Sequence, residues 1–558
     1  MSTFTIEPGS LTDAVERAYA RLDQLGFGDA LWRKRLDVWT TDPTVQQKVA
    51  NRLGWLDAVS VIAPQLPRLR DAADGVRRDG FTHVVLLGMG GSSLAPEVLR
   101  QTLGAGSNLV FHVLDSVDPE AVQWAMANAA TSLFILASKS GSTIEPNTMA
   151  AEARRRVVAA GHTNWGTRFI AITDEGTALH QSAAANGFRD IFVNPSDIGG
   201  RYSALSLFGM VPAALMGIDL DVIVSSARAM EAACRVESAR ENPGLALGAV
   251  MAAGAEHGRD KLTLLLPRQV HSFGLWVEQL VAESTGKQGT GIVPIAGESD
   301  AMSPGSDRLV VSVTVGSESP DEAVLLRVRS DSIPHVTIRM PDVTALGAEF
   351  LRWEIATATA GLLMGINPFD EPNVQQAKDA TRSLLDIYQQ QKRLPLPEPQ
   401  AIIGGARLTL SEAAQSALGG DAAIAFLRVI RRNDYFALLA FLPPDDSRYE
   451  PALEEFRMLV AKRAECATMF GYGPRYLHST GQLHKGGANN GVFIIVAADP
   501  AEDLAISDQS FSFGVLEMAQ ALGDFQSLDR TGRRAMLVHL PRRDPALLRS
   551  VAAALLDA

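Results

Sequence analysis

The chain has 558 residues, of which 46% are hydrophobic and 20% charged, and its formal net charge is −12. A chain of this length corresponds to several domains of about 100–200 residues each. The acidic balance argues against a nucleic-acid surface, but it is compatible with a local basic pocket for a small anion. No apolar run approaches the ~18 residues that a membrane span needs. We therefore expect neither a nucleic-acid nor a membrane partner.

Cysteine content and the N-terminus bear on the cellular compartment. The two cysteines, Cys234 and Cys466, are too few for a disulfide framework and suit a reducing environment. Residues 1–22 lack a basic stretch followed by an apolar core, so they do not read as a signal peptide. We expect a cytoplasmic protein.

Residues 1–75 show helical periodicity with few strand signals, which predicts an N-terminal helical segment. From residue 83 onward, short β-rich runs alternate with helical stretches. This alternation predicts a parallel sheet covered on both faces. We assign residues 76–235 to this first domain, with an apolar helical connector at 203–233. The predicted strands are 83–87, 109–114, 133–137, 169–173 and 190–193.

The alternation restarts in a second domain, 236–392. Its predicted strands are 261–266, 309–315, 324–328 and 335–340. Three prolines in five residues then indicate a linker at 393–405. A C-terminal α/β unit follows at 406–558, with helices near 452–465 and 513–522 and strands at 436–442, 492–497 and 535–540. The predicted fold class is α/β, with two doubly wound parallel-sheet domains.

The most informative stretch reads Ser138-Lys139-Ser140-Gly141-Ser142-Thr143. It lies between a predicted strand and a predicted helix, and four of its six residues carry a hydroxyl. Hydroxyls, backbone N–H groups and a helix N-terminus are what a phosphate needs. The alternative is a polar loop that only caps the helix.

A glycine-rich loop at 88–93, Gly-Met-Gly-Gly-Ser-Ser, also joins a predicted strand to a helix. This signal is weak alone, because such turns are common and the full dinucleotide-binding spacing is missing. The two loops together gain weight, since both would lie at one edge of a parallel sheet, where ligands bind.

Further candidates lie outside these two loops. Arg201 follows two glycines, and its guanidinium could stabilise an oxyanion. Gln279 and Glu283 lie four residues apart on one predicted helix face, where the carboxylate could act as a base. Lys378 lies in the second turn of a helix that follows a turn at 365–373. Each is more often an ordinary surface residue when taken alone.

The segment 478–487 contains two histidines, a lysine and three glycines. Histidine is the side chain best suited to move protons near neutral pH. An ordinary exposed loop is an equally good interpretation of this segment alone. The spacing of His478 and His484 fits no zinc pattern, so we predict no metal site.

Taken in chain order, these motifs resemble the phosphoglucose isomerase family, which is built from two sugar-isomerase (SIS) domains. The matching segments are GMGGSSLAP (88–96), SKSGSTIEP (138–146), DIGGRYSALS (197–206), EQLVAESTGK (278–287) and INPFDEPNVQQAK (366–378). The likeness spans about 75–390. The C-terminal part resembles the isomerase part of bacterial fused transaldolase/phosphoglucose isomerase proteins, and we expect no transaldolase barrel before residue 75.

The resemblance implies a sugar-phosphate site without metal, nucleotide or other cofactor. Gly91 and Ser92 would line the sugar, and Gln279 would hydrogen-bond to its open-chain form. The phosphate would be held by four residues of the 138–143 loop: Ser138, Lys139, Ser140 and Thr143. The resemblance also implies catalytic roles: Glu283 as the base, Arg201 beside the enediolate and Lys378 in ring opening.

Two departures from the family pattern stand out. The family usually has a glutamine after the Phe-Asp of the fifth motif, where this chain has Glu371. A second carboxylate would repel an anionic substrate, so Glu371 either points away or serves differently, and we place it outside the site.

The second departure concerns the histidine that opens the sugar ring. In the family this histidine lies between the base helix and the lysine helix, in a motif close to Leu-His-Ser-x-Gly-Gln. Between 288 and 377 this chain has only His335, in a strand-like run, whereas the motif occurs at 477–482. We therefore expect the C-terminal unit to dock on the SIS domains and present His478. His484 is the second candidate, and a neighbouring subunit is the other source left open.

The implied activity is reversible isomerisation of glucose 6-phosphate and fructose 6-phosphate through a cis-enediolate. Two alternatives stay open: an SIS isomerase of another sugar phosphate, and a regulatory SIS protein that keeps the 138–143 loop alone. Transaldolase activity would need a barrel, which the sequence does not indicate. The expected partner is a small-molecule sugar phosphate, and a homodimer is left open.

Overall fold

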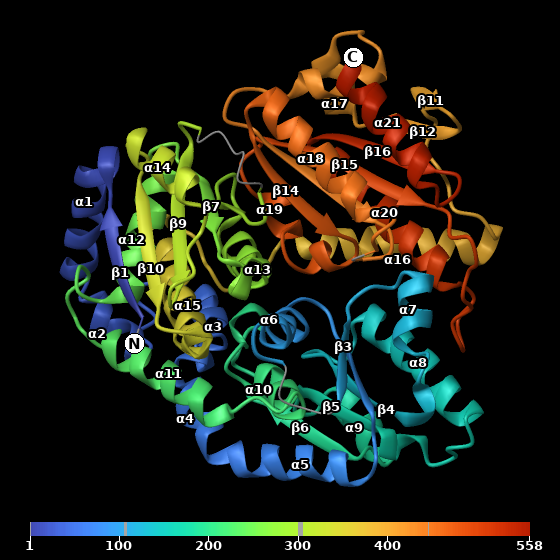
Figure 1. The fold of residues 1–558 in the computed structure, drawn as a ribbon, viewed down its shortest axis with the longest axis horizontal. Coiled ribbons are helices and arrows are strands. Elements are labelled where there is room, and N and C mark those ends of the chain that lie inside the picture. The colour runs from blue at the N-terminus through green and yellow to red at the C-terminus, as the bar shows by residue number, and fades with distance from the viewer. Residues whose placement is uncertain (1, 105–108, 299–304, 445) are drawn as a thin grey trace.

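The computed structural model describes residues 2–104, 109–298, 305–444 and 446–558. In this part of the chain, three β-sheets each carry a covering of helices, and Figure 1 shows them as three lobes. The N-terminal segment wraps the first two lobes with helices, and the C-terminal unit forms the third. The N-terminal helices are α1 (Thr12–Gln24), α2 (Phe27–Trp32), α3 (Pro43–Ala50), α4 (Ala58–Ile62) and α5 (Leu66–Arg78).

The first sheet is entirely parallel, in the order β3-β2-β4-β5-β6. Its central strands are buried on both faces, which explains their continuous apolar runs. The strand order reverses between β2 and β4, and such a switch point is where open α/β sheets bind ligands. The strands are β2 (His83–Leu87), β3 (Val110–Leu114), β4 (Ser132–Ala137), β5 (Phe169–Asp174) and β6 (Asp190–Asn194). The helices are α6 (Leu94–Leu103), α7 (Pro119–Ala125), α8 (Ile144–Ala159), α9 (Ala178–Ala185), α10 (Leu207–Leu215) and α11 (Leu220–Ala233).

The second sheet runs β1-β10-β9-β7-β8, parallel except for the edge strand β1. Its helices include α13, which follows β7 and reaches the first lobe. The strands are β1 (Thr3–Glu7), β7 (Lys261–Leu265), β8 (Val293–Ile295), β9 (Arg308–Val315) and β10 (His335–Met340). The helices are α12 (Pro243–Glu256), α13 (Phe273–Thr285), α14 (Glu322–Ser330) and α15 (Leu346–Leu363).

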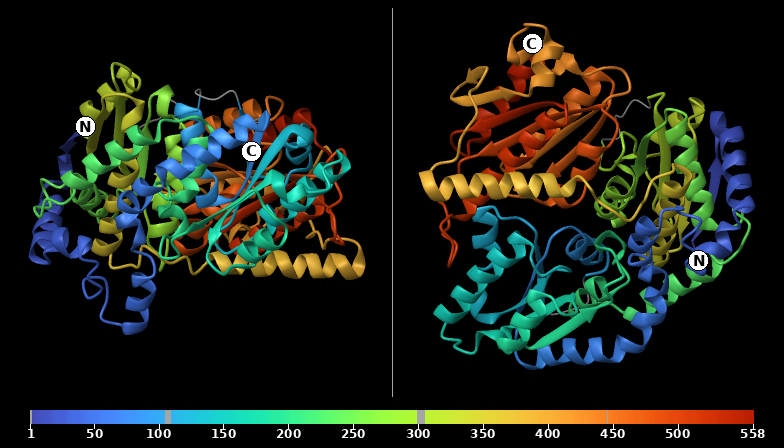
Figure 2. Two further views of the ribbon diagram at one scale, coloured as in Figure 1. Left: turned by 90° about the horizontal axis from the view of Figure 1, so that it is seen from below. Right: turned by 180° about the vertical axis from the view of Figure 1, so that it is seen from behind.

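The third sheet runs β11-β12-β16-β15-β13-β14, with four parallel strands and an antiparallel edge. Helix α16 (Val374–Gln391) packs on α20 of this unit, and Figures 1 and 2 show it as a long helix along the third lobe. The strands are β11 (Ala401–Ile403), β12 (Ala406–Leu410), β13 (Tyr435–Phe441), β14 (Ala467–Tyr472), β15 (Gly491–Ala498) and β16 (Arg534–Leu540). The helices are α17 (Glu412–Leu418), α18 (Glu450–Ala464), α19 (Gly481–Gly486), α20 (Phe513–Arg530) and α21 (Pro545–Asp557).

The α/β fold class is confirmed, and all but one of the predicted strands match observed ones to within one residue. The exception is 324–328, which lies in helix α14. Val324 and Val328 are both buried, as expected for one helix face, and Asp321 caps the helix by accepting from the backbone N–H of residues 323 and 324. The short apolar run was therefore wrongly taken for a strand, an ambiguity inherent in such runs.

Other strands went unpredicted. The N-terminal segment contributes β1, which pairs with β10 through an alternating burial pattern. Strand β11 lies within the stretch predicted as a linker, and β8, β12 and β14 were also missed. Strands β8 and β11 have only three residues each, too few for a period-two pattern to be recognised.

Buried ion pairs fasten the third unit to the first. Arg475 lies against Asp115 with two hydrogen bonds of 2.9 Å. Arg543, at the end of β16, reaches Asp118 at the start of α7 and Glu517 on α20, and all three side chains are at most 3% exposed. A buried charge that loses its partner is costly, so these pairs fix the position of the third unit.

We expect Arg543→Met to weaken this docking strongly. Removing the cation leaves the buried carboxylate of Asp118 without its partner, a loss of about 3–5 kcal/mol. The urea midpoint, followed by tryptophan fluorescence, should fall clearly. Arg542→Met is the matched control, because that neighbouring side chain is 69% exposed and pairs locally with Asp544. Equal midpoints for the two variants would contradict the role of Arg543.

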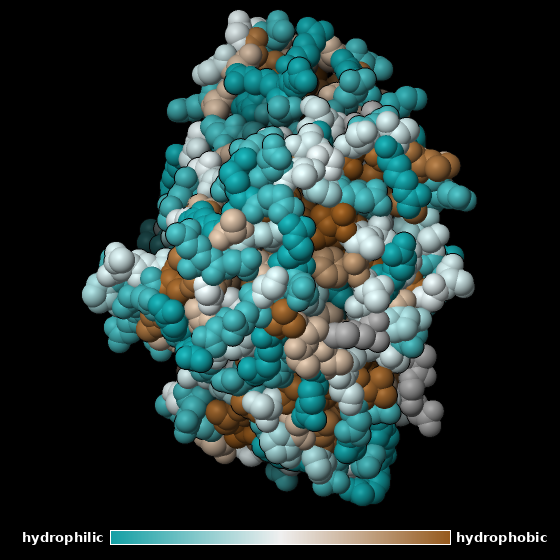
Figure 3. Space-filling view, turned by 90° about the vertical axis from the view of Figure 1, so that its left-hand side faces the viewer, coloured by the Kyte–Doolittle hydropathy of each residue, from teal (hydrophilic) through white to brown (hydrophobic). Residues whose placement is uncertain are grey.

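On the face seen in Figure 3, hydrophobic residues form separate small patches among hydrophilic ones. None of the helices in the described residues has the length and apolar character to cross a membrane. Both cysteine thiols are free and buried.

Candidate active site

One cavity of about 560 Å³ lies at the switch point of the first sheet. Segments from all three lobes line it, which the sequence order alone does not make obvious. Its lining includes all eleven residues predicted for the site: Gly91, Ser92, Ser138, Lys139, Ser140, Thr143, Arg201, Gln279, Glu283, Lys378 and His478.

The hydroxyl-rich loop 138–143 leaves β4 and enters α8. Gly141 has a positive φ of 66°, which lets the backbone turn there. The Ser138 hydroxyl donates to Thr143 Oγ1 at 3.3 Å and accepts from the Gly141 N–H at 3.1 Å. Thr143 is the N-cap residue of α8, yet its side chain makes no capping hydrogen bond. The Thr143 side chain therefore does not cap the helix, and Ser138, Ser140 and Thr143 line the cavity.

Lys139 is engaged at the cavity wall. Its ammonium donates to Asp174 Oδ2 at 2.5 Å and to the carbonyl of Ser196 at 2.7 Å. Burial raises the pKa of Asp174, and the hydrogen bond from Lys139 opposes that rise. The lysine thus brings a positive charge to the loop but shares it with a carboxylate.

Two glycine turns meet on the opposite wall. A Cβ on Gly91 would lie 2.0 Å from the carbonyl oxygen of Gly200, so no side chain fits there. Gly90 has φ of 54° and packs against the backbone of His478. Three segments approach one another closely because of these glycines. They are the loop after β2, the turn that carries Arg201, and the part of the third unit around His478.

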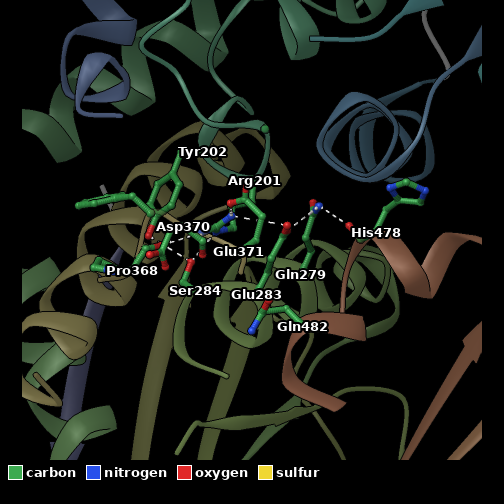
Figure 4. Close-up of polar contacts among 12 residues, drawn as sticks. Arg201, Tyr202, Gln279, Glu283, Ser284, Pro368, Asp370, Glu371, His478 and Gln482 are labelled. Atoms are coloured by element: carbon green, nitrogen blue, oxygen red, sulfur yellow. Dashed lines mark hydrogen bonds and ion pairs between the residues drawn. The ribbon is translucent and has the colours of Figure 1, made fainter. Parts of the chain in front are cut away.

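Arg201 is 4% exposed and every nitrogen of its guanidinium has a partner (Figure 4). Nε donates to Ser284 Oγ at 2.8 Å, and Nη2 donates to the carbonyls of Pro368 and Asp370 at 2.8 and 3.1 Å. Nη1 faces two carboxylates, Glu371 and Glu283. The cation is therefore fixed in place, and one edge of it is directed at the cavity.

Glu283 lies on α13, one helical turn after Gln279, whose Nε2 donates to it at 3.3 Å. Its Oε1 is 3.5 Å from Arg201 Nη1. Burial raises the pKa of the Glu283 carboxyl above its usual range, although Arg201 and His478 oppose the rise. A carboxyl poised in this way can both accept and release a proton.

His478 ends a 3₁₀ turn after β14 and reaches across to the first lobe. Its Nε2 lies 2.8 Å from Glu145 Oε1, which also accepts from Gln520 Nε2 at 2.7 Å. The carbonyl of His478 accepts from Gln279 Nε2 at 2.7 Å. Burial raises the pKa of Glu145, but His478 outweighs it and the pKa lies below its usual range. An ionised carboxylate thus orients the imidazole.

Three residues that contact the candidate site were missed from the sequence. Glu145 belongs to the SKSGSTIEP segment, so its position next to the loop was a usable signal. Gln520 lies on α20, far along the chain, and nothing in the sequence indicates its contact. Lys287 ends the EQLVAESTGK segment and is 1% exposed, donating to Asn367 O at 2.8 Å and Asp370 Oδ1 at 2.9 Å.

Glu371, which we placed outside the site, lines the cavity, so of the two alternatives it does not point away. Its Oε2 accepts from Arg201 Nη1 at 3.0 Å. Burial raises the pKa of Glu371, but Arg201 outweighs it and the pKa lies below its usual range. The ion pair explains how a second carboxylate is tolerated there.

The other candidate histidines lie elsewhere. His335 is buried in β10, with its ring nitrogen 2.7 Å from Ser312 Oγ, and His484 is buried beside Tyr435. Neither lines the cavity. Among the residues that the structure describes, no group of three or more histidine, cysteine, aspartate or glutamate side chains gathers to hold a metal ion.

Comparison with known proteins agrees with this arrangement. The family model for phosphoglucose isomerase matches residues 70–296. The glucose-6-phosphate isomerase of Cyanothece sp. (strain PCC 7425 / ATCC 29141) is 31% identical over 370 residues, 58% of this chain and 69% of that protein. The glucose-6-phosphate isomerase of Prochlorococcus marinus (strain NATL2A) is 27% identical over 406 residues, 64% of this chain and 76% of that protein.

Solved structures share the fold. A hypothetical protein from Thermus thermophilus superposes with a TM-score of 0.59 at 24% identity, covering 68% of this chain and 99% of that one. A glucose-6-phosphate isomerase from Chlamydia trachomatis gives a TM-score of 0.53 at 18% identity, covering 69% and 88%. The fold and the loop at its switch point define an α/β protein with parallel-sheet SIS-type domains. Among such proteins, this chain belongs to the phosphoglucose isomerase family.

Proposed function

We propose that the protein interconverts glucose 6-phosphate and fructose 6-phosphate through a cis-enediolate. The observation that carries the proposal is a single cavity that combines the 138–143 loop, a buried carboxyl at Glu283, the fixed cation of Arg201 and His478, which Glu145 contacts from behind the lining. Family membership and the similarity to the glucose-6-phosphate isomerases named above support the same reaction.

In the proposed complex, the phosphate binds at the N-terminus of α8. The hydroxyls of Ser138, Ser140 and Thr143 and the charge of Lys139 receive its oxygens, because a helix N-terminus with free donors favours an anion. The sugar then extends past Gly91 and Ser92 toward α13. Gln279, already bound to the third unit, would hydrogen-bond to the opened chain.

Ring opening requires a proton to reach O5 while another leaves the O1 hydroxyl. We assign this exchange to His478, whose imidazole Glu145 orients, with Lys378 assisting from α16. The contact with the Glu145 carboxylate at 2.8 Å fixes the orientation of the imidazole, and histidine is the side chain best suited to move protons near neutral pH. Ring closure on the other sugar reverses the same transfer.

Isomerisation follows from one carboxylate. Glu283 removes the C2 proton, the electron pair forms the C1–C2 double bond, and O1 becomes the enediolate oxygen. Arg201 lies where that negative charge develops, and a preorganised cation in a dry site is commonly a large contributor to rate. The O2 hydroxyl proton passes to O1, which moves the negative charge to O2, and Glu283 then returns its proton to C1 as the carbonyl forms at C2.

A coupled assay tests the proposal directly. Purified protein is given fructose 6-phosphate, and glucose 6-phosphate dehydrogenase reports the product, with a chelator present. Turnover is expected under these conditions. A folded protein that converts neither sugar phosphate would refute the proposal.

The pH dependence of kcat/KM should reflect the ionisation of Glu283. The base works as a carboxylate, so kcat/KM falls as pH drops through the pKa of Glu283 in the free enzyme. Because burial raises that pKa, we expect the acid limb above about 4.3, the ordinary value for glutamate. A profile that stays flat down to pH 4 would assign the base to another group.

Ser138→Ala combined with Thr143→Ala should weaken binding of every 6-phosphate ligand. The hydroxyls would contact the phosphate in ground and transition states alike, so KM rises while kcat changes little. Ser142→Ala is the matched control, since the cavity lining includes Ser138 and Thr143 but not Ser142. An unchanged KM in the double variant would leave the loop with a structural role only.

The finer expectations stand as predictions. All the proposed catalytic groups lie in one chain, and a homodimer is left open. The cytoplasmic location rests on the two unpaired cysteines. The likeness of the C-terminal part to fused transaldolase/phosphoglucose isomerase proteins rests on the sequence motifs.

A further inference from the structure

Glu371 shares one nitrogen of Arg201 with Glu283. Both carboxylates lie against Nη1, Glu371 with a hydrogen bond of 3.0 Å and Glu283 at 3.5 Å without one (Figure 4). The other nitrogens of the guanidinium are bound to Ser284 and to backbone carbonyls, so Nη1 is the position over which the carboxylates compete. In this structure Glu371 holds it.

We propose that Glu371 is a positioning residue that occupies Arg201 Nη1 in the resting site and so keeps Glu283 out of hydrogen-bond contact with the cation. The inference rests on the proposed function, in which Glu283 is the base. A glutamate bound directly to a guanidinium is a weak base, because the ion pair stabilises its charged form. Occupation of Nη1 by Glu371 preserves the basicity of Glu283.

Several hydrogen bonds fix the position of the loop that carries Glu371. Arg201 Nη2 binds the carbonyls of Pro368 and Asp370, and the buried Lys287 binds Asn367 and Asp370. From the third unit, Gln482 accepts from the backbone N–H of Asn373 at 2.8 Å. Glu371 is thus placed by contacts from three elements, while 39% of its side chain stays exposed to the cavity.

The surrounding charges are consistent with an ionised Glu371 on Arg201 and a more basic Glu283 beside it. Arg201, Arg52 and Lys287 face Glu371 and keep it ionised. Glu283 faces Arg201, Glu371, His478 and Lys287, and the negative charge of Glu371 is among the influences that raise its pKa, after burial. When the enediolate forms, its oxygen becomes a third anion beside Nη1. In the proposed sequence this oxygen displaces Glu371 from Nη1, and the partly exposed side chain of Glu371 turns toward solvent.

Glu371→Gln tests the inference, since it removes the charge and keeps the shape. A neutral acceptor binds Nη1 more weakly, so Arg201 closes on Glu283. We expect the acid limb of kcat/KM to move to lower pH by roughly half a unit or more. Glu371→Asp keeps the charge and should hold the limb near its wild-type position. Glu175→Gln is the matched control, because Glu175 lines the cavity without contacting Arg201, and it should leave the limb unmoved.

Inhibitor binding gives a second readout. A 5-phospho-aldonate carries a carboxylate where the enediolate oxygen would form, and Glu371→Gln should bind it about tenfold more tightly, equivalent to ~1.4 kcal/mol. Inorganic phosphate, which would occupy the 138–143 loop alone, should bind both proteins equally. An unmoved acid limb with unchanged aldonate affinity would overturn the inference. Absence of isomerisation by the wild-type protein would instead refute the proposed function, and aldonate calorimetry would still report on the contact.

Discussion

Glu283→Gln is expected to abolish isomerisation while leaving substrate binding nearly intact. The amide keeps the shape of the carboxyl and its contact with Gln279, but it cannot accept the C2 proton. Loss of a general base typically costs ~10²–10⁴-fold in rate. The loss should appear in kcat, with KM close to its wild-type value, because the step affected occurs after binding.

Glu278→Gln provides the control for this measurement. Glu278 is the residue on α13 that faces away from the cavity and accepts from the backbone N–H of Ala296 at 3.2 Å. Burial raises its pKa to about 8, so it is largely protonated at neutral pH and already resembles an amide. Its kcat should match wild type. Retention of more than about a tenth of wild-type turnover by Glu283→Gln would reassign the base, since that loss is smaller than the typical ~10²-fold.

His478→Ala should slow turnover of the closed sugar far more than that of an open one. The proposed role of the imidazole ends once the ring has opened, and general acid–base groups of this kind contribute typically ~10²–10⁴-fold. A 4,5-dideoxy analogue lacks both ring-closing hydroxyls and stays open. We expect its turnover to change little in the variant, while kcat for glucose 6-phosphate drops.

Two further variants test how far ring opening depends on the carboxylate partner of His478 and on the third unit. Glu145→Gln should reduce the same ring-dependent rate by a smaller factor, because the imidazole remains but loses its charged partner. Truncation after residue 395 should abolish ring-dependent turnover, since it removes His478 with the third unit. Equal losses on the closed and open substrates in His478→Ala would assign the histidine to binding and not to ring opening.

The sequence predicted much of the first sheet and the content of the site. Strands with both faces buried need continuous apolar runs, and loops that leave neighbouring parallel strands meet at one edge. The rest depended on contacts between distant segments. Gln520 on α20 binds Glu145 across the lobes, and no local pattern records such a contact. Glu371 was placed outside the site because repulsion from the substrate was considered without the ion pair to Arg201. The prediction of a strand at 324–328 was wrong because a short apolar run fits a strand and a buried helix equally.

The position of His478 in the last unit of the chain has a consequence for synthesis. The 138–143 loop, Arg201 and Glu283 all leave the ribosome before the strand that precedes His478 has been made. Chains are synthesised at about 5–20 residues per second, and domains fold largely in that order. A nascent chain would thus complete the proposed phosphate-binding loop and the proposed base well before it carried the histidine assigned to ring opening. Catalytic competence would arrive only when the third unit docks and the ion pairs of Arg475 and Arg543 close.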